Sequence, residues 1–164
     1  MSAKTSLSEL DLICKQAQEA KIELRRSSKA EKNDALKYAA DFLLKNKAKL
    51  IDANTIDMEL ASQKDLQDSF VDRLELNEKR IDSMISGLDK VINLDDPVGQ
   101  TDQPHTSPSG FEVSKMRVPL GVVGIIYESR PNVTADASAL CLKSGNACIL
   151  SCLLYTSPSP RDRG

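Results

Sequence analysis

Hydrophobic residues in the first 95 positions recur at steps of three and four, the spacing that places them on one face of a helix. The pattern predicts four amphipathic helices, each of which needs a partner surface to bury its apolar stripe. The second helix is expected to begin at Ser28, because Glu31 three residues on completes a capping box. The four stripes are Leu10, Ile13, Ala17, Ala20 and Leu24; Leu36, Ala39, Ala40, Leu43 and Leu44; Leu50, Ala53, Ile56, Leu60 and Ala61; and Ile81, Met84, Ile85, Leu88, Val91 and Ile92.

Proline and glycine interrupt this pattern and separate a helical segment, residues 1–95, from the rest of the chain. Residues 96–117 contain three prolines and two glycines, which favour turns over a long helix. Within this connection, Phe111, Val113 and Met116 indicate an edge strand or ribbon. The sequence therefore predicts a boundary near residue 95.

Residues 118–150 predict a strand, a helix and a second strand. The continuous apolar run at 122–126 is typical of a strand that is covered on both faces, as in a parallel sheet. We expect the following helix to start at Val133 or Thr134, and the second strand to begin at Ala147. The chain is therefore predicted to have an α/β fold, with N-terminal helices followed by the start of a Rossmann-like parallel sheet.

Polar residues follow the first of these strands, at the edge where ligands bind in open α/β sheets. The guanidinium of Arg130 offers a fork for a carboxylate or phosphate, and the amide of Asn132 can donate to a developing oxyanion. A polar turn that only caps the next helix is an equally good interpretation. The candidate cofactor- or substrate-binding residues are Glu128, Ser129, Arg130, Pro131 and Asn132.

Other reactive side chains give weaker signals. Cys141 and Cys148 lie at apolar positions, where a buried structural cysteine is commoner than a nucleophile. His105 is the only histidine and lies in a proline-rich loop, so no Ser/His or Cys/His pair is predicted. Lys143 is interpreted as a solvated charge in the last turn of a helix, and the acidic pair at 95–96 as a solvated turn.

Composition is that of an ordinary globular protein, with 40% hydrophobic residues, 28% charged residues and a net charge of −2. This balance gives no electrostatic reason to expect nucleic acid or a membrane surface as a partner. No apolar run approaches the ~20 residues of a membrane span, so a cytoplasmic protein is predicted. The four cysteines lack the paired spacing of a zinc site, and no metal is expected.

Three stretches carry a resemblance to a known family. VPLGVVGIIYESRPNVT, residues 118–134, is the most specific of them, and DSFVDRLELNEKRIDSMISGL and LDDPVGQ lie upstream. Together they resemble the gamma-glutamyl phosphate reductase family of the aldehyde dehydrogenase superfamily, over roughly residues 8–150. The resemblance implies an aldehyde dehydrogenase-like fold, in which residues 118–150 form the first strand, helix and strand of the NADPH-binding domain.

The resemblance also implies an activity, that of a glutamate-5-semialdehyde dehydrogenase in proline biosynthesis. Such enzymes reduce L-glutamate 5-phosphate with NADPH, giving L-glutamate 5-semialdehyde and phosphate. A cysteine thiolate displaces the phosphate, and hydride from the nicotinamide reduces the resulting acyl-enzyme. The resemblance implies Asn132 as an oxyanion donor, and a homo-oligomeric parent enzyme.

Only the N-terminal portion of the family is matched, and its nucleophilic cysteine is expected beyond this portion. The chain is therefore expected to be inactive alone. The last residues, 151–164, contain CLLYTSPSPRD, which resembles the translation of a sequencing adaptor. We expect the second strand to stop after Leu150 and the tail to be artefactual.

Three alternatives remain open. The chain could be a non-catalytic interaction module made of helices and half a nucleotide fold. It could instead be a fragment of a general aldehyde dehydrogenase, although the YESRPNV turn differs from the aromatic and proline-rich turn expected there. A fragment of a bifunctional pyrroline-5-carboxylate synthase is the third, and the short lead between Met1 and the first helix disfavours it.

Overall fold

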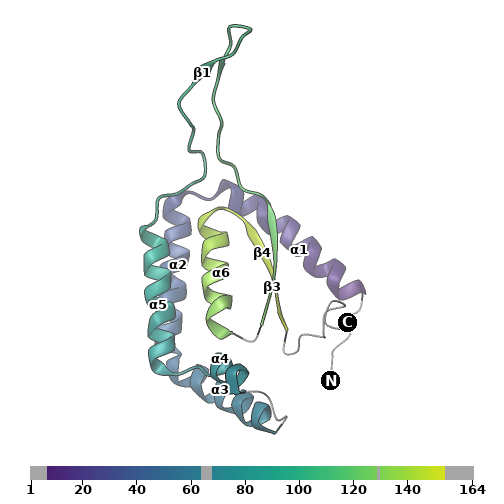
Figure 1. Cartoon of the computed structure of the whole chain (residues 1–164), viewed down its shortest axis with the longest axis vertical. Helices are drawn as coiled ribbons and strands as arrows, with labels where there is room; N and C mark the ends of the chain where they lie inside the picture. Colours follow the sequence, from purple (N-terminus) through teal and green to yellow (C-terminus); the bar gives the residue numbers. More distant parts are fainter. Residues whose placement is uncertain (1–6, 64–67, 129, 154–164) are drawn as a thin grey trace.

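The computed structural model describes residues 7–63, 68–128 and 130–153. Its elements follow the order helices, ribbon, strand, helix, strand (Figure 1), and the predicted α/β class is confirmed. The helices are α1 Leu7–Arg26, α2 Lys29–Lys45, α3 Lys47–Ser62, α4 Asp68–Leu74, α5 Glu78–Asn93 and α6 Pro131–Lys143. The strands are β1 His105–Thr106, β2 Glu112–Val113, β3 Val122–Glu128 and β4 Ala147–Leu153.

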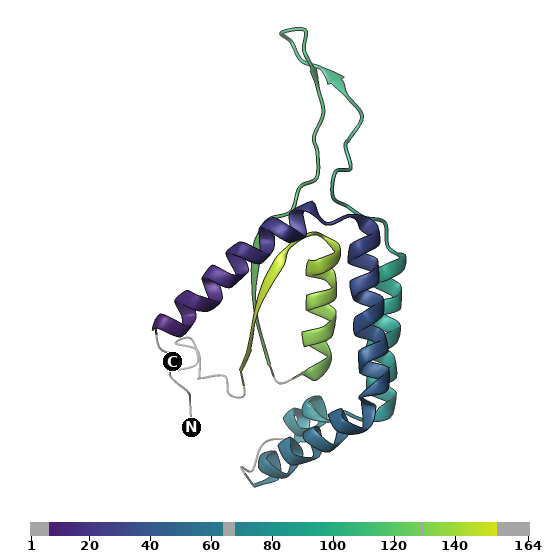
Figure 2. The ribbon, with the colours of Figure 1, turned by 180° about the vertical axis from the view of Figure 1, so that it is seen from behind.

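The helices and the β3–β4 sheet form layers. Helix α6 lies between the sheet and the pair α2 and α5, while α1 runs diagonally past the sheet and contacts β4 (Figures 1 and 2). Helices α3 and α4 lie together at the end of the molecule where β3 and β4 finish. At the other end, β1 and β2 pair antiparallel and form an arm that extends away from the body.

Helix α2 begins as the sequence predicts. The Glu31 carboxylate accepts from the Ser28 backbone N–H at 2.7 Å, and the Ser28 hydroxyl accepts from the Glu31 N–H at 3.2 Å. This capping box satisfies two donors that the first turn of a helix leaves without partners. The prediction succeeds because both partners lie within four residues of each other.

The core forms where the stripes of α2 and α5 meet α6. One buried cluster joins α2, α5 and α6, and a second joins α5 to the loop before it. Stripe residues of α1 and α3 are less covered: Leu10 is 48% exposed and Ile56 is 60% exposed. The two clusters contain Leu36, Ala40, Leu88 and Ala139, and Leu76, Ile81 and Met84.

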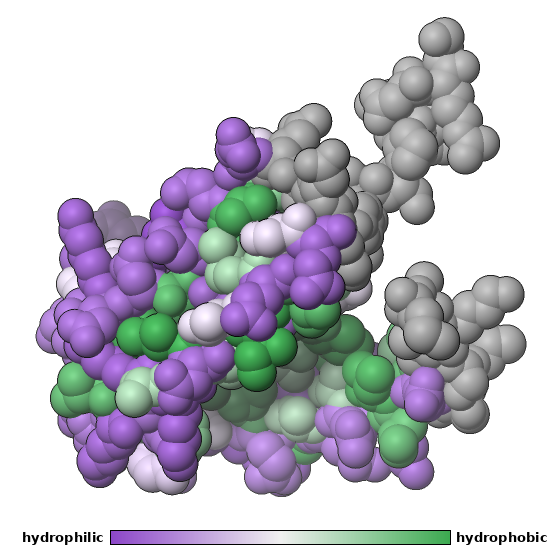
Figure 3. Space-filling view, turned by 90° about the horizontal axis from the view of Figure 1, so that it is seen from below, coloured by the Kyte–Doolittle hydropathy of each residue, from purple (hydrophilic) through white to green (hydrophobic). Residues whose placement is uncertain are grey.

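Apolar surface remains open outside these clusters. Figure 3 shows hydrophobic side chains gathered on the lower face of the molecule. A groove of about 660 Å³ between α2, α5 and α6 is lined almost entirely by apolar atoms, and Tyr38 and Phe42 stack beside it with ring centroids 6.5 Å apart. In the described part of the chain, the packing of the helices and strands therefore leaves apolar side chains exposed to solvent.

Strands β3 and β4 pair parallel, as predicted, from Val122 opposite Ala147 to Glu128 opposite Leu153. The expectation that both faces are covered is wrong for the described residues, because Ile126 is 72% exposed. The expected end of β4 after residue 150 is also wrong, since β4 continues to 153. Parallel pairing uses backbone groups only, and β3 offers them as far as its own end.

Helix α6 begins at Pro131, and the predicted start at Val133 or Thr134 is wrong by two or three residues. Proline suits the first helical position, because its fixed φ matches the helix and the N–H it lacks would have had no partner there. Arg130 precedes it in extended conformation, at φ −123° and ψ 101°, as a residue before proline prefers.

Two lysines of the helical body are buried. Lys32 of α2 is 2% exposed, and its ammonium lies 2.5 Å from the Asp96 carboxylate. Lys143 at the end of α6 is 3% exposed, and it donates to Asn33 Oδ1 at 2.7 Å and to the Ile92 carbonyl at 2.8 Å. The interpretations of Lys143 as a solvated charge and of Asp96 as a solvated turn are both wrong.

Burial and pairing shift the pKa values in this cluster. Burial would raise the pKa of Asp96, but hydrogen bonds from Lys32 and from the Val98 N–H outweigh it, so the net shift is downward. Burial lowers the pKa of Lys143, and nearby Lys29 lowers it further. A buried charge without a partner is costly, so the cluster fixes how α6 sits on α2 and α5.

Replacing Asp96 by Asn keeps the side-chain shape but leaves the Lys32 ammonium buried without its counter-charge. We expect the free energy of unfolding to fall by about 3–5 kcal/mol, the usual cost of removing one partner of a buried pair. Urea unfolding followed by circular dichroism measures the difference. Asp95 is the matched control, because its carboxylate is exposed and 3.9 Å from Lys29, and Asp95→Asn should change stability by less than about 0.5 kcal/mol.

The same pair predicts a pH dependence. The pKa of Asp96 in the folded chain lies below the ordinary value of 3.8, so its contribution to stability is complete above that value. It is lost as the pH falls through the lowered folded pKa. Acid titration of stability should therefore be less steep below pH 3.8 in Asp96→Asn than in the parent chain, and equal slopes would contradict the role of the pair.

Candidate functional site

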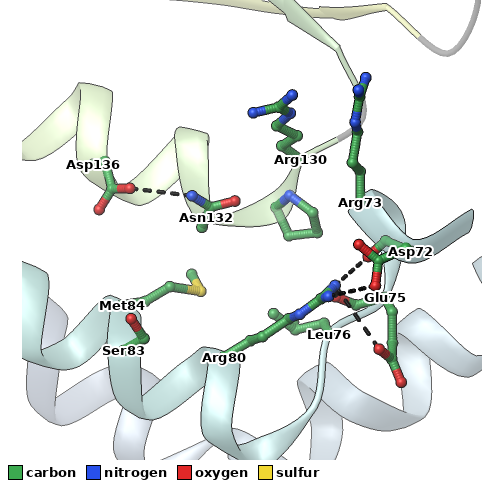
Figure 4. Close-up of a pocket in the computed structure, with 11 residues that line it drawn as sticks. Asp72, Arg73, Glu75, Leu76, Arg80, Ser83, Met84, Arg130, Asn132 and Asp136 are labelled. Atoms are coloured by element: carbon green, nitrogen blue, oxygen red, sulfur yellow. Dashed lines mark hydrogen bonds and ion pairs between the residues drawn. The ribbon is translucent and has the colours of Figure 1, made fainter. Parts of the chain in front are cut away.

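A cavity of about 480 Å³ opens at the carboxyl end of β3, between the α4–α5 region and the first turn of α6 (Figure 4). Arg80 lies opposite Arg130 and Asn132 across this cavity. The carboxyl end of β3, where the cavity opens, is the edge of the sheet at which the sequence predicts ligand binding. The lining residues are Asp72, Arg73, Glu75, Leu76, Arg80, Ser83, Met84, Arg130, Pro131, Asn132 and Asp136.

The structure brings three of the five candidate residues to the cavity, namely Arg130, Pro131 and Asn132. Glu128 does not line it, because its carboxylate forms an ion pair with Arg73 of α4 at 2.6 Å. Ser129 lies outside the described residues. The turn is thus divided between a part that faces the cavity and a part that joins β3 to α4.

The first turn of α6 is held against the end of β3. The Tyr127 hydroxyl and the Thr134 hydroxyl lie 2.6 Å apart, within hydrogen-bonding distance. The Arg130 N–H donates to the Glu128 carbonyl at 2.6 Å, which closes the turn. These contacts fix the position of residues 130–132 relative to the strand.

Arg130 occupies the cap position of α6, but its side chain makes no capping hydrogen bond. Its guanidinium is exposed and has no ion pair with any described residue. The other two arginines at the cavity are paired: Arg73 with Glu128, and Arg80 with Asp72 at 2.9 Å. Among the described residues, Arg130 is therefore the cavity cation that a bound anion meets without displacing a carboxylate.

The opposite wall depends on Asn54 of α3, a residue that is only 6% exposed. Its amide donates to the Leu74 carbonyl at 2.9 Å and accepts from the Leu76 N–H at 2.6 Å. These bonds fix the loop between α4, which carries Arg73, and α5, which carries Arg80. The sequence does not identify Asn54, Arg73 or Arg80 as residues of the cavity. The partners of Asn54 lie about twenty residues further along the chain, so no local pattern marks it.

The short helix α4, seven residues long, was not predicted either. It has no buried residue, and its seven residues are too few for the repeat of apolar positions that marks a longer helix. The start of α5 did have a signal: Asn77 Oδ1 accepts from the Arg80 N–H at 3.0 Å, the pattern of an asparagine cap three residues before its donor. That signal would have placed Arg80 in the first turn of a helix.

Asn132 is exposed, and its amide Nδ2 donates to Asp136 Oδ2 at 3.3 Å, one turn further along α6. This leaves the second N–H of the amide for another acceptor. The second N–H of the Asn132 amide is therefore an oriented hydrogen-bond donor at the cavity. A donor of this kind can stabilise negative charge that develops on an oxygen atom.

The other reactive groups lie elsewhere. Cys141 is buried, and burial together with the neighbouring Cys148 raises the pKa of its thiol, which makes it a poor nucleophile. Among the described residues, no group of three or more His, Cys, Asp or Glu side chains is placed to hold a metal ion. Within the same residues, no helix has the length and apolar character needed to cross a membrane.

Comparison with known proteins gives consistent results. No family model matches the chain. Proteins named gamma-glutamyl phosphate reductase do match: that of Thermodesulfovibrio yellowstonii is 49% identical over 142 residues, covering 85% of this chain, and that of Thermoanaerobacter sp. is 47% identical over 142 residues, covering 87%. Over most of its own length, the chain is therefore similar to proteins named gamma-glutamyl phosphate reductase. It spans about a third of the length of these relatives, 34% in both cases.

Solved gamma-glutamyl phosphate reductase structures have the same fold. The Thermotoga maritima enzyme matches 88% of this chain with a TM-score of 0.82 and 44% identity, and 35% of that enzyme is covered. The Saccharomyces cerevisiae enzyme matches 91% with a TM-score of 0.83 and 35% identity, and 38% of it is covered. A Bacillus subtilis protein described as an aldehyde dehydrogenase, 19% identical with a TM-score of 0.65, shares the fold, so the expected aldehyde dehydrogenase-like fold is confirmed.

Replacing Asn54 by Leu should loosen the cavity wall. The change leaves the Leu74 carbonyl and the Leu76 N–H without partners, and we expect a loss of about 2–4 kcal/mol in the free energy of unfolding. Hydrogen exchange at Leu76 should accelerate more than exchange in α2. Thr55→Val is the matched control, because the exposed Thr55 hydroxyl bonds only the Ile51 carbonyl one turn earlier. Equal exchange at Leu76 in both variants would contradict this role of Asn54.

Proposed function

We propose that this chain is part of a gamma-glutamyl phosphate reductase and contributes the turn at the carboxyl edge of the cofactor-binding sheet. The whole protein would reduce L-glutamate 5-phosphate with NADPH to L-glutamate 5-semialdehyde and phosphate, a step of proline biosynthesis in the cytoplasm. The observation that carries the proposal is a cavity at the end of β3, lined by Arg130 and Asn132, in a chain 49% identical to an enzyme of that name.

The residues present fit a nicotinamide cofactor. Strands β3 and β4 run parallel with α6 crossing between them, and ligands of such sheets bind outside the carboxyl ends of the strands. Arg130 and the turn around it lie at that edge and would face the cofactor or the substrate. When bound, NADPH would supply the hydride for the reduction. The preference for NADPH over NADH forms part of the proposal.

Two side chains of this chain would act on the substrate. L-glutamate 5-phosphate has two anionic groups. The guanidinium of Arg130, which forms no ion pair with any described residue, can bind one of them through a bidentate fork. The second N–H of the Asn132 amide would donate to the carbonyl oxygen as negative charge develops there. Neither role requires breaking an ion pair seen among the described residues.

The nucleophilic cysteine would come from another part of the whole protein. Cys141 is buried with a raised thiol pKa and Cys148 is half-buried, while Cys14 of α1 and Cys152 of β4 are exposed but do not line the cavity. We therefore propose that this chain alone has no reductase activity. The open groove beside α6 and the exposed face of β3 at Ile126 would be covered by further chain in the whole protein.

We also propose that the whole protein self-associates through its arm. The arm carries exposed apolar side chains, with Phe111 71% exposed and Met116 60% exposed. An extended pair of short strands with unpaired edges is suited to add to a sheet of a second copy. If the chain were a non-catalytic interaction module, it would share with the enzyme this self-association through the arm, but not the catalytic activity.

Activity can be tested in a full-length hybrid in which residues 7–150 replace the matching segment of the Thermotoga maritima reductase. We expect the hybrid to oxidise NADPH in the presence of L-glutamate 5-phosphate and to release phosphate. The 164-residue chain should do neither. A hybrid that folds cooperatively but shows no NADPH oxidation dependent on L-glutamate 5-phosphate would contradict the proposed function.

In the hybrid, Asn132→Ala should lower kcat by about 10²–10³ with little change in the KM for NADPH, because an oxyanion donor acts mainly in the transition state. Steady-state kinetics measure both constants. Asn93→Ala is the matched control, since the exposed Asn93 amide bonds only the Asp89 carbonyl. Unchanged turnover in Asn132→Ala would exclude the donor role.

Arg130→Ala should instead raise the KM for L-glutamate 5-phosphate by about 10- to 100-fold, as expected for the loss of one charge-assisted contact in an open site. Arg130→Lys should restore part of the affinity, because it keeps the charge but loses the fork. A rise in the KM for NADPH with an unchanged KM for the substrate would place Arg130 at the cofactor instead.

A further inference from the structure

The amide of Asn132 has a defined orientation because of its partner. An amide has an oxygen and a nitrogen end of nearly the same shape, and either end can face a neighbour. The neighbour here is Asp136, whose carboxylate oxygens accept hydrogen bonds, and Nδ2 of Asn132 lies 3.3 Å from its Oδ2. The contact therefore selects the rotamer in which the nitrogen, not the oxygen, faces Asp136 (Figure 4).

Asp136 is itself confined. It is half-buried at the contact of α5 and α6 and lines the same cavity as Asn132. Its second oxygen, Oδ1, points at Gly87 of α5, where an added Cβ would lie 3.2 Å away. That distance is shorter than an ordinary contact between these atoms, so a side chain at position 87 would press on the carboxylate.

Gly87 has no other evident reason to be glycine. It lies within α5, and it is not among the glycines with positive φ. Glycine inside a helix costs about 1 kcal/mol relative to alanine. Space for the Asp136 carboxylate, and for the close approach of α5 to α6, accounts for a residue that the helix alone would disfavour.

We propose that Asp136 is a positioning residue for the reductase reaction. It holds the Asn132 amide with one N–H bound and the other free for the substrate oxygen, and Gly87 provides the room for this arrangement. The inference rests on the proposed role of Asn132. Without Asp136, the amide can turn its oxygen toward the developing negative charge, which would repel it.

The test uses the full-length hybrid and the variant Asp136→Asn, which has the same shape but can present a donor or an acceptor to Asn132. We expect kcat to fall about 10- to 100-fold, with the KM for L-glutamate 5-phosphate changed less than threefold. Asp89→Asn, an exposed change on α5, is the matched control. Gly87→Ala should lower kcat in the same direction by a smaller factor.

A double-mutant cycle separates positioning from structural damage. If Asp136 acts through Asn132, then Asp136→Asn should cost nothing further in an Asn132→Ala background. A full additional loss in that background would overturn the proposal, and so would an unchanged kcat in Asp136→Asn when Asn132→Ala is impaired. Failure of Asn132→Ala itself to lower kcat would count against the proposed function instead.

A second measurement does not depend on activity. In the nuclear magnetic resonance spectrum of the 164-residue chain, one Asn132 side-chain amide proton should exchange more slowly than its partner. Asp136→Ala should remove the difference, and Asp89→Asn should keep it. Equal exchange of the two protons in the parent chain would overturn the proposal whatever the kinetic result.

Discussion

Strands β3 and β4 run parallel, so the chain has to return along the outside of the sheet between Glu128 and Ala147. Helix α6 is this return segment, and the rest of the structure depends on it. Its first turn must begin at the edge where β3 ends, which brings Arg130 and Asn132 to the same place. Its outer side becomes the surface against which α2 and α5 pack.

The far end of α6 is fixed by buried charge as well as by apolar contact. The Lys143 ammonium donates to Asn33 of α2 and to the Ile92 carbonyl of α5, and next to it Lys32 pairs with Asp96. Buried ammonium groups tolerate few arrangements, because each lost partner costs a desolvated charge. These bonds set how far α6 slides along its neighbours, and so where its first turn meets the cavity.

Local features could be predicted from the sequence, and distant partners could not. The capping box of Ser28 and Glu31, the stripe of α5 and the parallel pairing all follow from residues close together or from a strong pattern. The Lys143 contact joins residues 110 positions apart, and the Arg73 contact with Glu128 joins residues 55 apart. A charged residue is usually solvated, and only the folded chain shows when it is not.

In the sequence, the turn after β3 is equally compatible with a ligand site and with a simple helix cap, and the structure shows how α6 begins. Arg130 occupies the cap position without using its side chain for capping, and proline at the next position has no N–H that needs a cap. Helix α6 is instead anchored by the Tyr127 and Thr134 hydroxyls and by its buried far end. The proposed ligand contacts of Arg130 and Asn132 therefore do not compete with the start of the helix. A capping turn would also not require the Asn132 amide to be oriented, whereas a donor to a substrate oxygen would.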